Sequence, residues 1–357
     1  MSLPLRIVVS LGLLALVIAF ADWSEVWRVL RDVRLDWAGA ALLLAFCDRL
    51  LMNARWQILL TGRGVALAFG RLLRVQLAAN FLGSFLPASI GVDAVRIAAL
   101  ARAGHPVAPV VASTLVDRAS IVLATLVFGS AAVVLLAEAR VPAEVARFVY
   151  AMTAIGLIGC AVCLHPAVRR WVRAALVPRV PERFREPVTR IAVAALAYAG
   201  ERRTLAAVGM TTVAVFAVRI LFAKSVALAC GVDIPIADLL LVVPILWIAV
   251  MLPVTIGGIG VQDASYVVLM ALIGIAAPVA VSMSLVEHVV TRLATLPGVL
   301  FLSDVARRRG DVARRRGDAA RRQGDAERNA GDVERRRAGE PPAAQLDPSR
   351  STTAPRK

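Results

Sequence analysis

Ionisable side chains in the middle of long apolar runs are the residues of this sequence most able to do chemistry. Asp117 and Arg118 lie inside residues 107–137, a run that is otherwise apolar or built of small residues. A charge inside a lipid bilayer costs several kcal/mol unless it is paired, so each one needs a functional or structural reason. Arginine binds phosphate groups, and buried carboxylates balance its charge or exchange protons.

From this chemistry we predict a polar cavity near the bilayer midplane that binds an anionic head group. The predicted substrate-binding side chains are three arginines and two hydroxyl residues: Arg118, Arg219, Arg292, Ser89 and Thr255. The predicted charge-balancing or proton-relay side chains also lie inside apolar runs: Asp117, Glu287, His288, Asp48 and Arg49. The alternative is structural, because Asp and Arg pairs also clip membrane helices together and a lone His often only packs.

Neighbouring positions on a helix point about 100° apart, so Asp117 and Arg118 need different partners. We predict that Arg118 faces the cavity and that Asp117 pairs with a basic residue of the second half, Arg219 or Arg292. Lys224 has two interpretations, a role in the cavity or a long stem that carries its ammonium group to the membrane surface.

Cofactor chemistry finds no pattern in the sequence. Cys160 and Cys163 occupy one apolar helix without other metal ligands, which is typical of packed thiols. The glycine-rich residues 257–260 lack the Lys-Ser/Thr of a phosphate-binding loop. We therefore predict no catalytic residue, no metal site and no cofactor.

The elements that must position these side chains are membrane helices. Of 357 residues 59% are apolar, and the mean hydropathy of +0.73 excludes a soluble enzyme. The formal net charge of +16 sits mostly in loops and tail beside apolar runs, where Lys and Arg contact anionic lipid. Anionic membrane lipids are thus the predicted partners, and nucleic acid is not.

Basic loops mark the cytoplasmic side of a membrane protein. The strongest markers are residues 165–203, predicted as a basic amphipathic segment, and residues 303–357, predicted as a disordered, low-complexity basic tail. The tail either contacts anionic lipid or is an extension without function. The prediction is a polytopic domain of residues 1–302 in the cytoplasmic (inner) membrane, multi-pass, with both termini in the cytoplasm.

Two apolar runs are interrupted by the same pattern, Leu-Pro-x-Ser/Thr-Ile-Gly, at residues 86–91 and 252–257. Each arm beside an interruption would span only about 18–22 Å, whereas the hydrocarbon core is about 30 Å thick. The charge rule places both ends of the first run inside and both ends of the second outside. We therefore predict an all-α integral membrane protein with about six full spans and two oppositely oriented re-entrant hairpins, in an inverted repeat of residues 37–137 and 204–302.

The hairpin tips combine backbone breakers with helix N-termini. Their residues are Pro87, Gly91, Asp93, Pro253, Gly257, Gly258, Gly260 and Asp263. A helix that restarts at a tip points unpaired N–H groups and a positive dipole end toward the membrane centre, where an anion is favoured. Asp93 and Asp263 also stand where capping residues belong, so self-capping is the alternative to substrate binding.

These segments resemble the flippase-like membrane region of lysylphosphatidylglycerol synthases. The resemblance rests on residues 80–96, 116–118 and 252–263 and closes with Arg292 and residues 296–298. The family typically has Gly-x-Arg-Glu where this chain has Gly-Val-Gln-Asp at its second tip, so the basic contact there is missing and the carboxylate is kept. The resemblance implies a stand-alone lipid-translocating region without the aminoacyl-transferase domain.

The predicted function is therefore translocation of an anionic phospholipid or lipid-linked phosphate across the cytoplasmic membrane, and not enzymatic catalysis. One alternative is an integral-membrane transferase acting on a lipid, with Asp117 or Glu287 as the base. Another is a membrane scaffold for a separate lipid or cell-envelope enzyme, which would make a lipid-modifying enzyme a partner.

Overall fold

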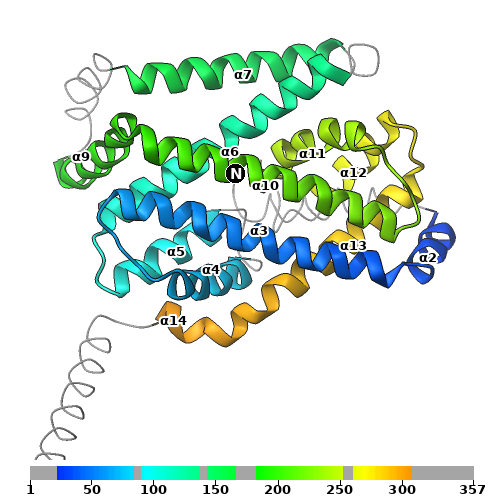
Figure 1. Cartoon of the computed structure of the whole chain (residues 1–357), viewed down its shortest axis with the longest axis horizontal. Coiled ribbons are helices and arrows are strands. Elements are labelled where there is room, and N and C mark those ends of the chain that lie inside the picture. Colours follow the sequence, from blue (N-terminus) through cyan, green and yellow to red (C-terminus); the bar gives the residue numbers. More distant parts are fainter. Residues whose placement is uncertain (1–21, 84–89, 137–142, 166–181, 252–259, 307–357) are drawn as a thin grey trace, which may run out of the picture. The chain divides into compact units, whose positions relative to one another are not determined.

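The computed structural model describes residues 22–83, 90–136, 143–165, 182–251 and 260–306 (Figure 1). Within these ranges all regular structure is helical and no strand occurs, so the all-α prediction is confirmed there. Helices satisfy their own backbone hydrogen bonds, as lipid requires. The chain divides into residues 1–306 and residues 307–357, and the second unit lies wholly outside the described ranges.

One series of helices occurs twice: a long helix, two short helices and another long helix. The first series is α3 (Leu35–Gly62), α4 (Phe69–Gly83), α5 (Ile90–Arg102) and α6 (Val107–Leu136). The second series is α10 (Arg202–Ala229), α11 (Ile236–Met251), α12 (Val261–Leu272) and α13 (Ala277–Thr295). The remaining described elements are α2 (Trp23–Arg31), α7 (Ala143–Leu164), α9 (Glu182–Leu196), η2 (Ala197–Gly200), η3 (Leu296–Phe301) and α14 (Leu302–Ala306).

Glycines with positive φ end matching helices in the two series. Gly64 follows α3 with φ 75° and Gly231 follows α10 with φ 79°, a shift of 167 residues. Gly104 follows α5 with φ 88° and Gly274 follows α12 with φ 79°, a shift of 170 residues. In all four turns the next N–H bonds to the carbonyl five residues back, the pattern that favours glycine at a helix end. The shift grows because the second tip segment is three residues longer.

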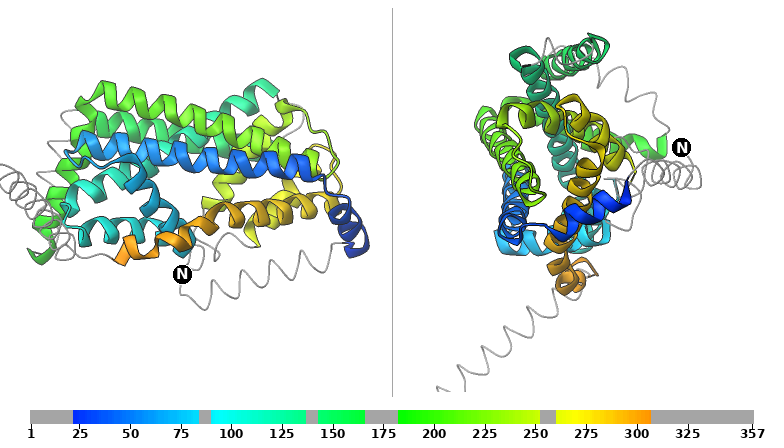
Figure 2. Two further views of the ribbon diagram at one scale, coloured as in Figure 1. Left: turned by 60° about the horizontal axis from the view of Figure 1, so that its bottom comes forward. Right: turned by 90° about the vertical axis from the view of Figure 1, so that its right-hand side faces the viewer.

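The two series interlock. The long helices α3 and α10 lie side by side and antiparallel, since Arg34 near the start of α3 bonds to Ala229 at the end of α10 (Figures 1 and 2). The helix that leads into each tip packs on the last long helix of the other series: α11 on α6, and α4 on α13 and η3. The hydrophobic core thus joins elements far apart in the sequence, and it brings both tips next to partners from the opposite half.

Three helices are long and apolar enough to cross a membrane: Val107–Val134, Arg202–Ala229 and Ala277–Val305. The helices α4, α5, α11 and α12 have 15, 13, 16 and 12 residues. At 1.5 Å per residue these helices are about 18–24 Å long, less than the roughly 30 Å of a hydrocarbon core. Short helices at the predicted arms are therefore observed, while the segments between them, 84–89 and 252–259, lie outside the described residues.

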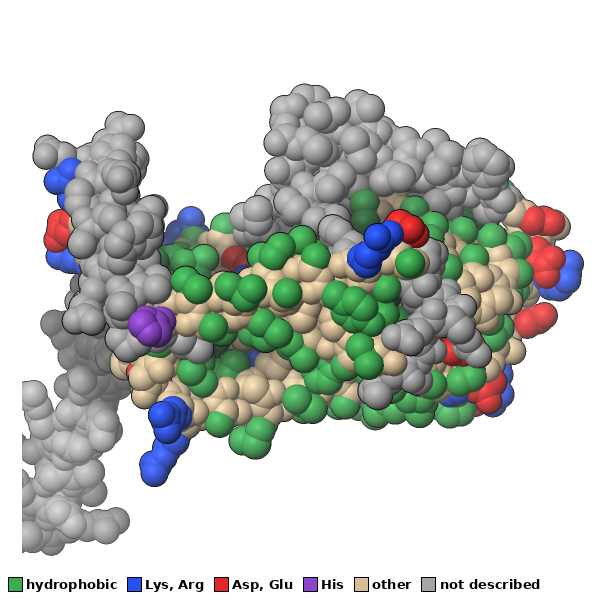
Figure 3. All heavy atoms as spheres, turned by 90° about the horizontal axis from the view of Figure 1, so that it is seen from above, with side chains coloured by type: hydrophobic (Ala, Val, Ile, Leu, Met, Phe, Trp, Pro, Cys, Tyr) green, Lys and Arg blue, Asp and Glu red, His purple; other side chains and the backbone are tan. Residues whose placement is uncertain are grey.

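Large apolar side chains also face outward. They include Leu43, Val122, Ile155, Met210 and Val289. On the face shown in Figure 3, apolar side chains spread over the middle and most charged side chains gather toward the two ends. Such a surface is costly in water and suits lipid contact, which agrees with the membrane-spanning character of the long helices.

The end of the helical unit differs slightly from the predicted boundary at residue 302. Residues 303–306 belong to α14, where Val305 is buried against Val75, Ala78 and Ala99. Val305 is the first apolar residue of the basic tail, and it adds to the core between α4 and α5. The predicted first helix, within residues 5–20, lies outside the described residues.

Substituting Gly298 should destabilise the fold. A Cβ atom at Gly298 would lie 2.2 Å from the carbonyl oxygen of Leu77, so η3 or α4 must move. We expect Gly298→Ala to lower the free energy of unfolding by about 1–3 kcal/mol or more, the usual cost of overpacking. Gly209→Ala is the matched control, because a Cβ there meets no atom within 4 Å. Equal thermal unfolding midpoints of the two variants in detergent would contradict this packing argument.

Candidate functional site

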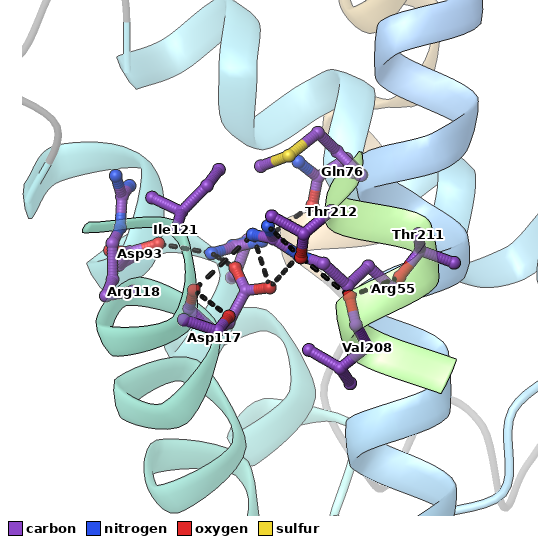
Figure 4. A network of polar contacts seen from close by, with 12 residues as sticks. Arg55, Gln76, Asp93, Asp117, Arg118, Ile121, Val208, Thr211 and Thr212 are labelled. Carbon is purple, nitrogen blue, oxygen red and sulfur yellow. Dashed lines mark hydrogen bonds and ion pairs between the residues drawn. The ribbon is translucent and has the colours of Figure 1, made fainter. Parts of the chain in front are cut away.

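Three helices of the first series bring five charged side chains together inside the unit. They form the arginine centre: Arg55 of α3, Asp93 and Arg96 of α5, and Asp117 and Arg118 of α6 (Figure 4). The Nε and Nη2 atoms of Arg55 lie 2.8 Å and 2.7 Å from Oδ1 of Asp117. Nη2 of Arg96 lies 3.7 Å from the other oxygen of Asp117. Both oxygens of this carboxylate therefore face a cation.

Asp93 holds the remaining two arginines. It pairs with Arg96 on its own helix and accepts a hydrogen bond from Nε of Arg118 at 2.5 Å. Arg96 also donates to Oε1 of Gln76 at 3.0 Å and stacks on Trp56, with its Cζ 4.5 Å from the ring centroid. Three arginines thus meet two carboxylates, which leaves the arginine centre with an excess of positive charge.

Exposure separates the arginines of this centre. The side chains of Arg55 and Arg96 are 0% and 1% exposed, whereas 34% of the Arg118 side chain is exposed. A fully buried arginine needs its carboxylate as a structural partner. Arg118 is the member best placed to meet a molecule entering from outside the helix packing.

The predicted partner of Asp117 was wrong, although the prediction that Asp117 and Arg118 have different partners is confirmed. Asp117 pairs with Arg55 and Arg96 of the first half, and neither Arg219 nor Arg292 contacts it. The reason is that α3 and α5 pack directly on α6 and supply nearer cations. Arg96 had counted as a marker of a cytoplasmic loop, but its side chain is buried.

A second group of ionisable residues, the histidine centre, lies between α12 and α13: Asp263, Tyr266, Glu287 and His288. Asp263 accepts hydrogen bonds from Ser284 at 2.5 Å and from the backbone N–H of Gly260 at 2.9 Å, and its Oδ1 lies 3.1 Å from Nε2 of His288. Glu287 accepts hydrogen bonds from the Tyr266 hydroxyl and, at 3.0 Å, from Gln262. The predicted acids Asp263 and Glu287 therefore lie one helix apart, beside His288.

Arg219 connects the two long antiparallel helices. Its Nε donates to Oδ1 of Asp48 at 2.9 Å, and Arg49 donates to Oδ2 of Asp48 at 3.1 Å. The guanidinium of Arg219 lies over Trp247, 3.8 Å from the ring centroid. Its Nη1 is buried and has no hydrogen-bond partner among the described residues. A buried donor without a partner is costly, so this nitrogen is a candidate contact for a bound anion.

The self-capping alternative fits Asp263, whose carboxylate accepts the N–H of Gly260 just before α12. Gly260 has φ 86°, a conformation that other residues rarely adopt. Asp93, in contrast, bonds to two arginines. Gly91 is buried at the start of α5. The other predicted tip residues lie outside the described ranges: Pro87, Ser89, Pro253, Thr255, Gly257 and Gly258.

Two further predicted cations lie apart from these centres. Lys224 donates to the Ile234 carbonyl at 2.5 Å and pairs with exposed Asp233 near the end of α10, as its surface interpretation requires. Arg292 lies half-buried on α13, one turn after His288, with no ion-pair partner in the described part of the chain. No group of three possible metal ligands occurs within the described ranges.

Comparison with known proteins gives one family and one relative. The model of the family described as "Lysylphosphatidylglycerol synthase TM region" matches residues 5–298. The glycosyltransferase AglD of Haloferax volcanii is 28% identical over 345 residues, and the match covers 82% of this chain and 53% of the relative. The chain thus spans about half the length of this relative. No solved structure matches the chain.

Proposed function

This chain belongs to the family of lysylphosphatidylglycerol synthase transmembrane regions, and from that premise we propose that it moves an anionic lipid between the leaflets of the cytoplasmic membrane. The sequence resemblance is confirmed by the family match. The family and the glycosyltransferase relative together suggest a membrane role related to lipids. The lipid of this proposal is a phospholipid or a lipid-linked phosphate.

The observation that carries the proposal is the excess of positive charge in the arginine centre. Three arginines meet two carboxylates within the helical unit, and Arg219 with Arg49 repeats the imbalance around Asp48. Uncompensated charge inside a membrane domain is expensive, and a phosphate oxygen would compensate it through charge-assisted hydrogen bonds. Arg118 is the proposed first contact because it is the most exposed, and Nη1 of Arg219 is the proposed donor deeper inside.

The proposed topology places the short helices in two re-entrant hairpins. In this arrangement α4 and α5 enter from the cytoplasmic side, and α11 and α12 enter from the opposite side. Their lengths support it, since none reaches across a bilayer alone, and so does the antiparallel packing of α3 on α10. The helices α5 and α12 would start near the membrane centre, with both chain termini in the cytoplasm.

Purified full-length protein in phosphatidylcholine vesicles tests the proposal. The vesicles carry a trace of fluorescent phosphatidylglycerol, and external dithionite bleaches label that reaches the outer leaflet. We expect bleaching to proceed beyond the outer-leaflet pool in protein-containing vesicles, and faster for phosphatidylglycerol than for a neutral labelled lipid. If several anionic lipids, a polyprenyl phosphate included, stayed as protected as in protein-free vesicles, translocation would be excluded.

A scaffold role is the second candidate, and the relative named as a glycosyltransferase favours it. In that role this chain would hold a separate lipid-modifying enzyme at the membrane. Reproducible co-purification of one such enzyme, together with absent lipid movement, would support the scaffold. An enzymatic role for the chain itself fits less well, because Arg55 and Arg96 occupy both oxygens of Asp117, the candidate base.

A further inference from the structure

The arginine centre and the histidine centre occupy matching places in the two helix series. The shift of 170 residues that relates the turn at Gly104 to the turn at Gly274 also relates the two centres. It carries Asp93 onto Asp263, Arg96 onto Tyr266, Asp117 onto Glu287 and Arg118 onto His288. The same shift aligns Leu115-Val116 with Leu285-Val286, directly before the acidic residue.

The contacts of the two centres match as well as the positions. Arg118 donates to Asp93, and His288 lies 3.1 Å from Asp263. In the other pair of contacts, Arg96 faces Asp117 and Tyr266 donates to Glu287. Each half thus has two carboxylates, one on each helix of a packed pair, and each carboxylate contacts a donor from the neighbouring helix.

The chemistry of the donors differs between the halves. Arginine stays charged at any relevant pH and donates without accepting, so the carboxylates of the arginine centre stay ionised. In the histidine centre a neutral hydroxyl and a titratable imidazole replace the two arginines. Glu287 therefore has no permanent cation among its hydrogen-bond donors, which are Tyr266 and Gln262.

Both protonation states of Glu287 find partners in this arrangement. As a carboxylate it accepts from Tyr266 and Gln262, as observed. As a carboxylic acid it can donate to the Tyr266 oxygen, because a phenol both donates and accepts, while its carbonyl oxygen keeps the bond from Gln262. The neighbouring His288 is 18% exposed and titrates near neutral pH, so it can pass a proton between Glu287 and the outside.

The charges around Glu287 come from three helices. Asp263 and Tyr266 face it from α12, His288 lies beside it on α13, and Arg219 acts on it from α10. Arg219 is itself paired with Asp48 of α3. Farther out, Cys230 at the end of α10 faces Tyr266, Arg292 follows one turn along α13, and the packed helix α2 carries the exposed pair Glu25 and Arg28.

We propose that Glu287 binds and releases one proton in each transport cycle, with His288 as the relay, so that lipid movement is coupled to protons. This inference rests on the proposed lipid translocation. An anionic head group brings a negative charge into the unit when it binds at the arginine centre. A proton taken up by Glu287 offsets that charge, which lowers the cost of moving the lipid through a medium of low dielectric constant.

Vesicles with two simultaneous readouts test the proposal. Dithionite bleaching follows labelled phosphatidylglycerol, and pyranine in the lumen follows pH. For the wild type we expect a pH gradient to change the rate of lipid movement at least severalfold, with a matching change in lumen pH, and a sodium gradient to have no effect. Glu287→Gln should lose the response to the pH gradient. Glu144→Gln, which neutralises an exposed carboxylate on α7, is the control and should respond like the wild type.

Each outcome decides the matter. Lipid movement without any response to the pH gradient would overturn proton coupling and leave translocation standing. A response to sodium instead of pH would assign the site to another cation and also overturn the proposal. Absent lipid movement under all conditions would remove both proposals. If Glu287→Gln does not fold, Tyr266→Phe serves instead, because it keeps the ring and should shift the pH midpoint of transport; an unchanged midpoint would contradict the role of Glu287.

Discussion

Replacing Asp117 with asparagine should destabilise this protein more than any other single change at the candidate site. The variant takes the negative charge from between two side chains that are fully buried, Arg55 and Arg96. Removing one member of a buried ion pair typically costs about 3–5 kcal/mol, because the other charge is left without compensation. Arg96 keeps Asp93 as a partner, so most of the cost falls on Arg55, whose other contacts are the hydroxyl of Thr212 and a backbone carbonyl.

Asp233→Asn is the matched control for this variant. It makes the same chemical change in an exposed pair with Lys224, where an ion pair contributes at most about 1 kcal/mol. We expect the thermal unfolding midpoint in detergent to fall strongly for Asp117→Asn and little for Asp233→Asn. The double variant Arg55→Met with Asp117→Leu should recover much of the loss, since it strands no charge. Equal midpoints for the two single variants would mean that the arginine centre does not stabilise the fold.

The sequence predicted the helices better than the contacts between them. Proline, glycine and the length of apolar runs were enough to predict the short arms, which appear as α4, α5, α11 and α12. Helical spacing alone was enough to give Asp117 and Arg118 separate partners. Such local rules depend on the geometry of one helix, and this is why they hold without knowledge of the packing.

The partners of Asp117 could not be read in the same way, because they depend on which helices touch. Arg55 lies near the end of its apolar run and resembled a boundary residue, although its spacing of seven from Asp48 places both on one face of α3. Arg96 was assigned to a basic loop, although it follows Asp93 by three residues and the two form an ion pair. Attention to helical spacing between charges would have found both residues.

Charge placement also explains why the two halves were hard to compare from sequence. The arginines of the first half correspond to tyrosine and histidine in the second, so the two centres share only their carboxylates. The matching turns at Gly104 and Gly274 fix the alignment between the halves, and this alignment is visible only once the backbone conformation is known.

Replacing Arg118 with glutamine should block lipid movement and leave the protein folded. Arg118 is the arginine of its centre with the most exposed side chain, and its loss does not strand Asp93, which still pairs with Arg96. Losing one charge-assisted hydrogen bond to a phosphate costs about 1.5–3 kcal/mol, which corresponds to a roughly tenfold to hundredfold slower transfer. The dithionite assay measures the rate, and thermal unfolding in detergent verifies the fold.

Two further variants separate the role of the charge from that of the fold. Arg147→Gln removes an exposed arginine that pairs with Glu144 on α7, and it should change neither rate nor stability. Arg118→Lys keeps the charge but loses the planar fork that binds two oxygens, so its rate should fall between those of the wild type and Arg118→Gln. Because Asp117→Asn lowers stability and Arg118→Gln lowers rate, two adjacent residues would report on different tasks. If Arg118→Gln moved lipid at the wild-type rate, or unfolded as readily as Asp117→Asn, the arginine centre would hold the helices together and bind no head group.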